Sequence, residues 1–216
     1  MGTALRRASP LDDGGAGRLI LEAAPSLAVI LHDSAVAKRA AAAAFRTERS
    51  VFGYRFALLA DGDAGLVGLV VAYPGRLHAS LKLGTGVALA RAAGTRHVGD
   101  LVRRGRILDR LLPSVRSDCL YVSVLAVDSE HRRQGIGSAL MERVLAGAER
   151  LGLAVAVDVG VEDEPARSLY EGLGFRVEEV RRTTSLDRRL LPTEGLARME
   201  RRGSRGPAAR EAKPSE

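Results

Sequence analysis

The chain has 216 residues, of which 46% are hydrophobic, 27% charged and only 4% aromatic, and its formal net charge is +7. This hydrophobic content can fill one core, and no apolar run approaches the roughly 20 residues that a membrane-spanning helix needs. The chain contains one cysteine, Cys119, which excludes an internal disulfide and favours a reducing compartment, so we expect a single domain in the cytoplasm with no membrane partner.

The excess of arginine raises the question of nucleic-acid binding. Many of the arginines alternate with Glu or Asp, and the chain has no Trp on which single-stranded bases could stack. We interpret the charge as a solvated basic surface, part of which can steer an anionic ligand, and expect no nucleic-acid partner. The four histidines (32, 78, 97 and 131) have no metal-site spacing, so they are interpreted as exposed polar residues and no metal is expected.

The N-terminal segment predicts one strand and two helices. Residues 4–8 form a plausible first strand, and residues 18–24 a helix that Pro25 stops. The alanine-rich residues 35–45 have high helix propensity, with Asp33 as the predicted cap.

A hairpin and an unusual segment come next. The apolar runs 56–60 and 66–73 flank Asp61-Gly62-Asp63, which is typical of a hairpin turn. Residues 74–118 then combine periodic leucines with several arginines and read as two helical pieces around a break at 94–99. Two interpretations of this segment stay open: a cap over a substrate site, or extra helices that shield a sheet edge or a homodimer face.

The central stretch of the chain predicts a strand, a glycine turn and a helix. Residues 121–127 are almost all apolar and rich in β-branched side chains, which indicates a buried strand. After a polar connector, residues 134–138 lead into a run whose apolar side chains recur at i, i+4 and i+8, as in an amphipathic helix. The first turn of a helix has unpaired N–H groups and the positive end of the helix dipole, so Gly135 and Gly137 would let a phosphate approach.

Two common phosphate-binding motifs do not fit this turn. A mononucleotide P-loop needs Gly, four residues and then Gly-Lys-Ser/Thr, a pattern that the chain lacks. The dinucleotide fingerprint needs a third glycine where Leu140 stands and a turn directly after the strand, whereas seven residues separate Val127 from Gly135.

The C-terminal third predicts a second buried strand, a short helix and two further strands. In residues 153–161 valines alternate with Ala154, Ala156, Asp158 and Gly160, and we expect a strand parallel to the first. A carboxylate on such a strand either has hydrogen-bond donors or serves chemistry. Asp163 and Pro165 begin a helix that the glycines at 172 and 174 end. Strands are predicted at 176–182 and 195–201, and a disordered basic tail at 202–216.

Arg132-x-x-Gly135-x-Gly137, after a strand that ends in Leu125-Ala126-Val127, resembles the coenzyme A loop of the GNAT superfamily of acyl-CoA-dependent N-acyltransferases. Residues 169–175, Leu-Tyr-Glu-x-Leu-Gly-Phe, are similar to a second GNAT motif in the right order. The resemblance implies an α/β fold: a mixed, mostly antiparallel sheet of about seven strands flanked by helices, with a helical insertion between strands 3 and 4. Residues 1–201 would form the single domain and residues 74–118 the insertion.

The resemblance also implies where acetyl-CoA binds. The diphosphate would lie on the loop amides and the pantetheine arm along the free backbone of a strand that splays from its neighbour. The implied cofactor-binding residues are Leu125, Ala126, Val127, Arg132, Arg133, Gln134, Gly135, Ile136, Gly137, Ser138 and Asp163.

The implied reaction is transfer of an acetyl group from acetyl-CoA to a primary amine by direct attack in a ternary complex. By this resemblance, Tyr170 corresponds to the tyrosine that protonates the departing sulfur, and Asp158 corresponds to a general base. The alternative is that Asp158 has a structural role and that a water chain or Glu130 acts as the base. The acceptor is not readable from the sequence. A CoA-binding regulatory protein of the same fold, without catalysis, is the alternative function.

Overall fold

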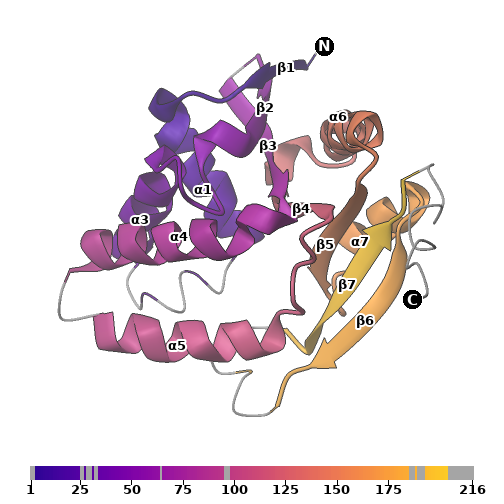
Figure 1. Ribbon diagram of the computed structural model, residues 1–216. Helices are drawn as coiled ribbons and strands as arrows, with labels where there is room; N and C mark the ends of the chain where they lie inside the picture. The colour runs from indigo at the N-terminus through magenta and orange to yellow at the C-terminus, as the bar shows by residue number, and fades with distance from the viewer. Residues whose placement is uncertain are drawn as a thin grey trace, which may run out of the picture.

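The computed structural model describes residues 3–24, 27, 31, 34–63, 65–94, 98–184, 188 and 193–203. The described residues contain seven strands: β1 (Ala4–Arg7), β2 (Ala57–Gly62), β3 (Gly65–Pro74), β4 (Cys119–Val127), β5 (Ala154–Gly160), β6 (Arg176–Arg182) and β7 (Gly195–Arg201). They form one sheet in the order β1-β2-β3-β4-β5-β7-β6, in which only β4 and β5 are parallel neighbours (Figure 1). This confirms the predicted mixed, mostly antiparallel sheet.

Helices cover both faces of the sheet. Those described are α1 (Asp13–Ala23), α3 (Ser34–Arg46), α4 (His78–Ala93), α5 (Val98–Leu111), α6 (Ile136–Leu151) and α7 (Glu164–Gly172). Helices α1, α3 and α4 pack on one face, called the α4 face below, and α6 and α7 on the other, called the α6 face (Figure 1). No helix of the described segments combines the length and apolar character that crossing a membrane would require.

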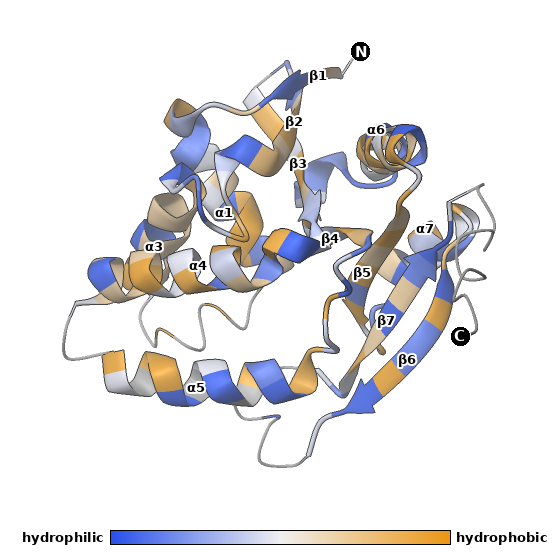
Figure 2. Ribbon diagram, in the orientation of Figure 1, coloured by the Kyte–Doolittle hydropathy of each residue, from blue (hydrophilic) through white to orange (hydrophobic). Residues whose placement is uncertain are grey.

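The alternation predicted for β5 separates two hydrophobic cores. Its valines at 155, 157 and 159 pack with α6 and α7, whereas Ala154 and Ala156 face the α4 side. The larger core lies under α1, α3 and α4 and contains Phe45 and Tyr73 without solvent exposure. In Figure 2 the central strands are mainly hydrophobic, while the edge strand β6 carries mostly hydrophilic residues.

The first helix begins earlier than predicted. Helix α1 starts at Asp13 rather than Arg18, directly after a 3-10 turn at Pro10–Asp12. Ser9 and Asp12 form a capping box there, and Arg46 of α3 forms an ion pair with Asp13 at 2.7 Å. These contacts and the packing of α1 on α3 outweigh the low helix propensity of the glycines in its first turns. The predicted cap Asp33 lies outside the described residues.

The segment between β3 and β4 contains the two predicted helices, α4 and α5. Helix α4 packs beside α3, and Lys82 of α4 forms an ion pair with Asp109 of α5 at 3.0 Å. Near the end of α5, Arg181 of β6 donates hydrogen bonds to the carbonyls of Arg110 and Leu112. The insertion therefore reaches from the α3 side to the last strands of the sheet (Figure 1). Of the predicted tail, only residues 202 and 203 are described.

Candidate functional site

The two parallel strands separate after a short paired stretch. Strand β4 pairs with β5 only from Cys119 opposite Ala154 to Val122 opposite Val157. Beyond that point β5 continues beside β7 and β4 continues beside β3. The predicted fork is therefore present, and among the described residues no strand pairs with 123–127 on their β5 side. Leu125, Ala126 and Val127 lie on this free edge.

A β-bulge lies at the base of the fork. Val71 and Ala72 of β3 pair with Val124 and Val122, so Ser123 stands between the two pairs without a partner. Its hydroxyl donates a 2.5 Å hydrogen bond to the carbonyl of Val51, in the loop after α3. Bulges end regular pairing and re-aim side chains. This bulge fixes the bend of β4 against that loop.

The glycine turn leads from the free edge into α6. Arg133 and Gly135 have positive φ angles of 62° and 79°, and α6 begins at Ile136 without a side-chain cap. The positive φ at position 135 favours glycine, although the space that a Cβ would occupy there is open. Arg132, Arg133 and Gln134 are exposed, and the Arg132 guanidinium donates to the carbonyl of Val127 at 3.2 Å. The unpaired first amides of α6 therefore stand beside an open turn, as anion binding requires.

Gly137 and Ser138 lie in the first turn of α6. A Cβ added to Gly137 would meet Leu169 of α7 at 3.4 Å and Val127 at 3.7 Å, which are ordinary contact distances. The fold itself thus tolerates a side chain at this position. The same contacts bring α7 close to the glycine turn.

Tyr170 lies on α7 next to Leu169 and is 4% exposed. Its ring packs against Phe175 with the centroids 5.5 Å apart, and within the described chain its hydroxyl has no hydrogen-bond partner. Burial, with a smaller contribution from Asp163, raises the pKa of this phenol, so it keeps its proton at neutral pH. Asp163 itself caps α7 by accepting a 3.1 Å hydrogen bond from the amide of Ala166.

Asp158 forms a buried ion pair. Its two oxygens accept hydrogen bonds from the Arg198 guanidinium at 2.6 and 2.9 Å, and one also accepts from the Tyr121 hydroxyl at 2.8 Å. The side chains of Asp158 and Arg198 are only 5% and 4% exposed. Because both oxygens are occupied by donors, this geometry favours a structural role for Asp158 over that of a general base.

Aromatic and titratable side chains surround this ion pair on the α4 face. The Tyr73 hydroxyl lies 3.0 Å from Nδ1 of His78, and the imidazole meets the Tyr121 ring at a centroid distance of 5.5 Å. Burial lowers the pKa of His78, and the charges of Lys82 and Arg198 add to that effect. The interpretation of His78 as an exposed polar residue is therefore wrong, because its ring is half-buried against two tyrosines.

Both ends of the insertion meet at this cluster. His78 is the first residue of α4, and Arg198 donates 2.9 Å hydrogen bonds to the carbonyls of Pro113 and Ser114, just after α5. The two predicted catalytic residues lie on opposite faces of the sheet, Tyr170 with α6 and Asp158 with Tyr121. No group of three His, Cys, Asp or Glu side chains suited to a metal ion occurs in the described residues.

Sequence reasoning missed Tyr73, His78, Tyr121 and Arg198 as members of a polar cluster. Arg198 carried a partial signal: it is a charged residue two positions from Leu196 and next to Met199, in a predicted strand that proves to be mostly buried. A buried charge needs an opposite charge, and Asp158 on the other buried strand was the available partner. The position of His78 had no such signal, because it depends on how the insertion folds back.

The forked parallel strands, with a glycine turn at the head of the helix that connects them, are the architecture implied by the resemblance to acyl-CoA-dependent N-acyltransferases. The family model described as "Acetyltransferase (GNAT) family" matches residues 36–175. The chain belongs to this family of acyltransferase enzymes.

Solved structures agree with this fold. An N-acetyltransferase from Staphylococcus aureus Mu50 superposes with a TM-score of 0.71 at 15% identity, over 91% of this chain and 99% of that one. A PaiA N-acetyltransferase from Thermoplasma acidophilum, in complex with coenzyme A, has a TM-score of 0.51 at 12% identity, over 94% and 99% of the two chains. At such identities the likeness concerns the fold alone.

Two curated relatives are similar in part. The chain is 43% identical to human N-acetyltransferase 8 over 65 residues, which are 30% of this chain and 29% of that protein. It is 32% identical to the [ribosomal protein bS18]-alanine N-acetyltransferase of Escherichia coli K12 over 83 residues, which are 38% of this chain and 56% of that enzyme. The match thus spans little more than half of the bacterial relative and less than a third of the human one.

Proposed function

We propose that this protein is an N-acetyltransferase that transfers the acetyl group of acetyl-CoA to a primary amine by direct attack in a ternary complex. The observation that carries the proposal is the free edge of β4 at the fork, followed after the short connector 128–134 by the open glycine turn at the start of α6. The family and the CoA-bound fold neighbour support the choice of ligand.

The residues of the fork fit the parts of this cosubstrate. The exposed turn 132–135 and the first amides of α6, at residues 136–138, would hold the diphosphate, since amides and arginines both favour an anion. The free backbone at Leu125, Ala126 and Val127 would hold the amide-containing arm, and an N–H on this edge can face a carbonyl oxygen that gains negative charge. Asp163 contributes through its cap of α7, which positions that helix beside the turn.

Bound acetyl-CoA would supply a thioester, whose C–S bond breaks as the C–N bond to the amine forms. Tyr170 is the proposed donor of a proton to the leaving sulfur. Its hydroxyl has no partner within the described chain, keeps its proton because of burial, and belongs to the helix that contacts the turn.

The amine must lose a proton on the other side of the fork. Asp158 is poorly suited, because Arg198 and Tyr121 occupy its oxygens. We propose His78 for this step and a positioning role for Asp158, which holds Tyr121. Burial favours the neutral imidazole, and with its proton on Nδ1 donated to Tyr73, His78 presents a free lone pair at Nε2. Glu130 lies on the exposed connector Ser129–His131 after β4.

The acceptor would approach from the α4 face, under the insertion whose two ends meet the polar cluster. An amine acceptor agrees with the relatives, one of which is named for the alanine of a ribosomal protein. Cytoplasmic location remains our expectation. The second candidate function, CoA binding without catalysis, would need the fork but not the Tyr170 hydroxyl.

The experiment that tests the proposal follows free-thiol release from acetyl-CoA across a panel of primary amines, including small amines, lysine derivatives and peptides with free N-termini. Thiol release that depends on one amine, with a product heavier by one acetyl group, supports the proposal. CoA binding in calorimetry without transfer to any amine supports the regulatory alternative.

A matched pair of variants tests the binding site. Gly137→Asp places a negative charge in the first turn of α6, where it suits the helix dipole but repels a diphosphate, so CoA should bind at least about tenfold more weakly. Gly147→Asp makes the same change in the second half of the helix, where an added Cβ would meet open space, and should bind CoA normally. Equal affinities of the two variants would contradict the assignment of the turn.

A second pair tests the proton donor. Tyr170→Phe should lower kcat while leaving CoA affinity within about twofold, because only the proton transfer is lost. Tyr54→Phe removes an exposed hydroxyl that binds Glu48 and serves as the control. A fully active Tyr170→Phe enzyme would remove this residue from the mechanism.

A further inference from the structure

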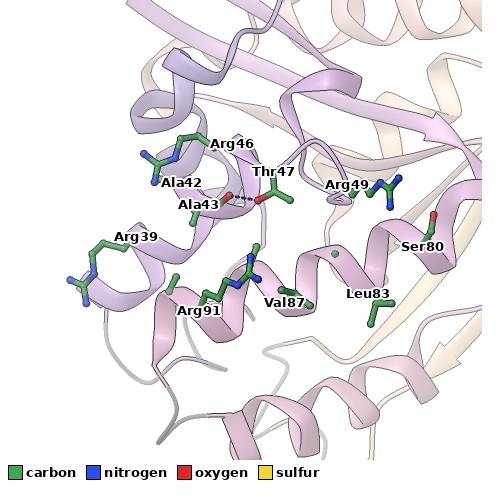
Figure 3. Close-up of a pocket in the computed structure, with 13 residues that line it drawn as sticks. Arg39, Ala42, Ala43, Arg46, Thr47, Arg49, Ser80, Leu83, Val87 and Arg91 are labelled. Carbon is green, nitrogen blue, oxygen red and sulfur yellow. Dashed lines mark hydrogen bonds between the residues drawn. The ribbon is translucent and has the colours of Figure 1, made fainter.

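A basic groove lies between α3 and α4, on the outer side of the α4 face (Figure 3). It is a hollow of about 850 Å³ that is open to solvent. Four arginines line it: Arg39 and Arg46 from α3, Arg49 from the following loop and Arg91 from α4. No acidic side chain is among the described residues that line it, so every formally charged residue of the lining is positive.

Three of these charges have no partner among the described residues. Arg46 forms an ion pair with Asp13 at 2.7 Å, whereas Arg39, Arg49 and Arg91 make no side-chain hydrogen bond or ion pair within the described residues. Many other described arginines near acidic residues are paired, including Arg18 and Arg116. The groove therefore offers cationic groups to a ligand without first breaking an ion pair.

The floor of the groove is apolar. Leu83 and Val87 are 73% and 42% exposed and lie one turn apart on α4, and small side chains such as Ala42 and Ala92 complete the surface. In Figure 3, Arg91, Val87 and Leu83 follow one another along α4. Exposed apolar side chains inside a charged rim are typical of a site that another molecule covers.

Helix α4, one wall of the groove, is anchored to the loop after α3. Thr85 is buried and accepts a 2.9 Å hydrogen bond from the amide of Val51, while its hydroxyl donates to the carbonyl of Leu81 at 2.8 Å. At Gly84 the helix runs so close to the carbonyl of Arg49 that a Cβ could not fit. Helix α4 is thus fixed against the loop 47–53, and little ordering is needed before a ligand binds.

We propose that this groove is the docking site for an acidic, amphipathic segment of a protein partner. The α4 residues that line it run from Ser80 to Ala92, which spans roughly 18 Å at about 1.5 Å per residue and matches a partner helix of about three turns. Carboxylates of the partner would pair with Arg39, Arg49 and Arg91, and its apolar side chains would cover Leu83 and Val87.

Other anionic ligands fit less well. A lipid bilayer presents a broad surface that cannot enter a groove between two helices. A nucleic acid would place phosphates over an apolar floor, and no described aromatic side chain lines the groove to stack with its bases. The proposal concerns binding alone and does not depend on acetyltransferase activity.

The test is a fluorescence-anisotropy titration of the full chain with a labelled peptide of about 14 residues, in which Glu and Leu recur three and four positions apart. Two control peptides keep the spacing but replace every Leu by Gln, or every Glu by Gln. The titration is done at about 50 mM and about 200 mM salt, because ion pairs at a solvent-facing rim are screened.

We expect the acidic amphipathic peptide to bind and both control peptides to bind at least about tenfold more weakly. Arg39→Glu/Arg91→Glu and Leu83→Ser should each weaken binding at least about fivefold. The matched control Arg143→Glu/Arg150→Glu makes the same charge change at exposed positions of α6 and should bind like the unchanged protein. Thermal melting shows whether each variant is folded.

Several outcomes would overturn the proposal. They are no peptide binding up to about 1 mM, equal binding of the peptide without Leu, and an equal loss in the α6 variant, which would indicate general charge attraction. Binding of phosphatidylserine vesicles or duplex DNA that the Arg39→Glu/Arg91→Glu change abolishes, without peptide binding, would assign the groove to another ligand.

Discussion

Replacing Arg198 by Met should destabilise the protein strongly. The guanidinium makes two hydrogen bonds to Asp158 and two to the carbonyls of Pro113 and Ser114, and both members of the ion pair are less than a tenth exposed. Removing one partner of such a pair leaves an uncompensated buried charge, which costs about 3–5 kcal/mol. For a domain of this size that corresponds to a decrease of roughly 6–20 °C in Tm.

The free energy of unfolding is measured by urea titration, with far-UV circular dichroism as the probe, for the members of a double-mutant cycle. Asp158→Asn/Arg198→Met removes both charges and should lose less stability than the two single variants together, since no lone charge stays buried. Lys82→Met breaks the exposed pair with Asp109 and should cost no more than about 1 kcal/mol. A loss below about 1 kcal/mol for Arg198→Met, or additive single variants, would refute the argument that breaking the buried pair leaves a costly unpaired charge.

Three further predictions follow from buried polar groups. Burial lowers the pKa of His78, so the folded state binds fewer protons than the unfolded state, and the free energy of unfolding should fall as pH decreases through and below about 6.5. This fall should be smaller in His78→Gln, and identical pH profiles of the two proteins would refute the prediction. Cys119 is buried, and desolvation raises the pKa of its thiol to about 11. The native protein should therefore react slowly with a thiol reagent at neutral pH, and one thiol per chain should react readily only after unfolding in urea. Thr85→Val should lose about 1–3 kcal/mol, because the Val51 amide loses its acceptor; a loss as small as that of Thr47→Val would argue against it.

The low reactivity expected of Cys119 also bears on the acceptor screen. That screen detects the thiol of free CoA, and the chain contains one cysteine. A native protein with an unreactive thiol gives a low background, so slow transfer to a poor acceptor can still be measured. Rapid labelling of Cys119 in the native protein would show instead that the start of β4, near Arg116, opens readily.

The two proposals are separable by experiment. The Gly137→Asp variant tests CoA binding at the turn on the α6 face, whereas the Arg39→Glu/Arg91→Glu variant tests peptide binding in the groove beside α4. One feature connects the two regions: the loop 47–53 contacts Thr85 of α4 and also Ser123 at the base of the fork. A partner in the groove would therefore lie against a loop that touches the site.

Local pattern alone was sufficient for most elements. The strands at 176–182 and 195–201, the helix after Asp163 and the alternation of β5 follow from side-chain periodicity and capping, which act over a few residues. The start of α1 was wrong by five residues, because the contacts that extend it come from Ser9 and from Arg46 on another helix. Propensity cannot report such contacts.

The sequence by itself determined the glycine turn, the parallel strands around it and the family, since these depend on residues close together in the chain. The geometry of the Asp158–Arg198 pair, which occupies both carboxylate oxygens, and the surroundings of His78 were decided only by the tertiary structure. Arg198 lies 40 positions from Asp158, and His78 meets Tyr121 only after the insertion folds back on the α4 face. A buried carboxylate becomes either a base or half of an ion pair according to the groups that long-range packing brings to it, and no local pattern contains that information.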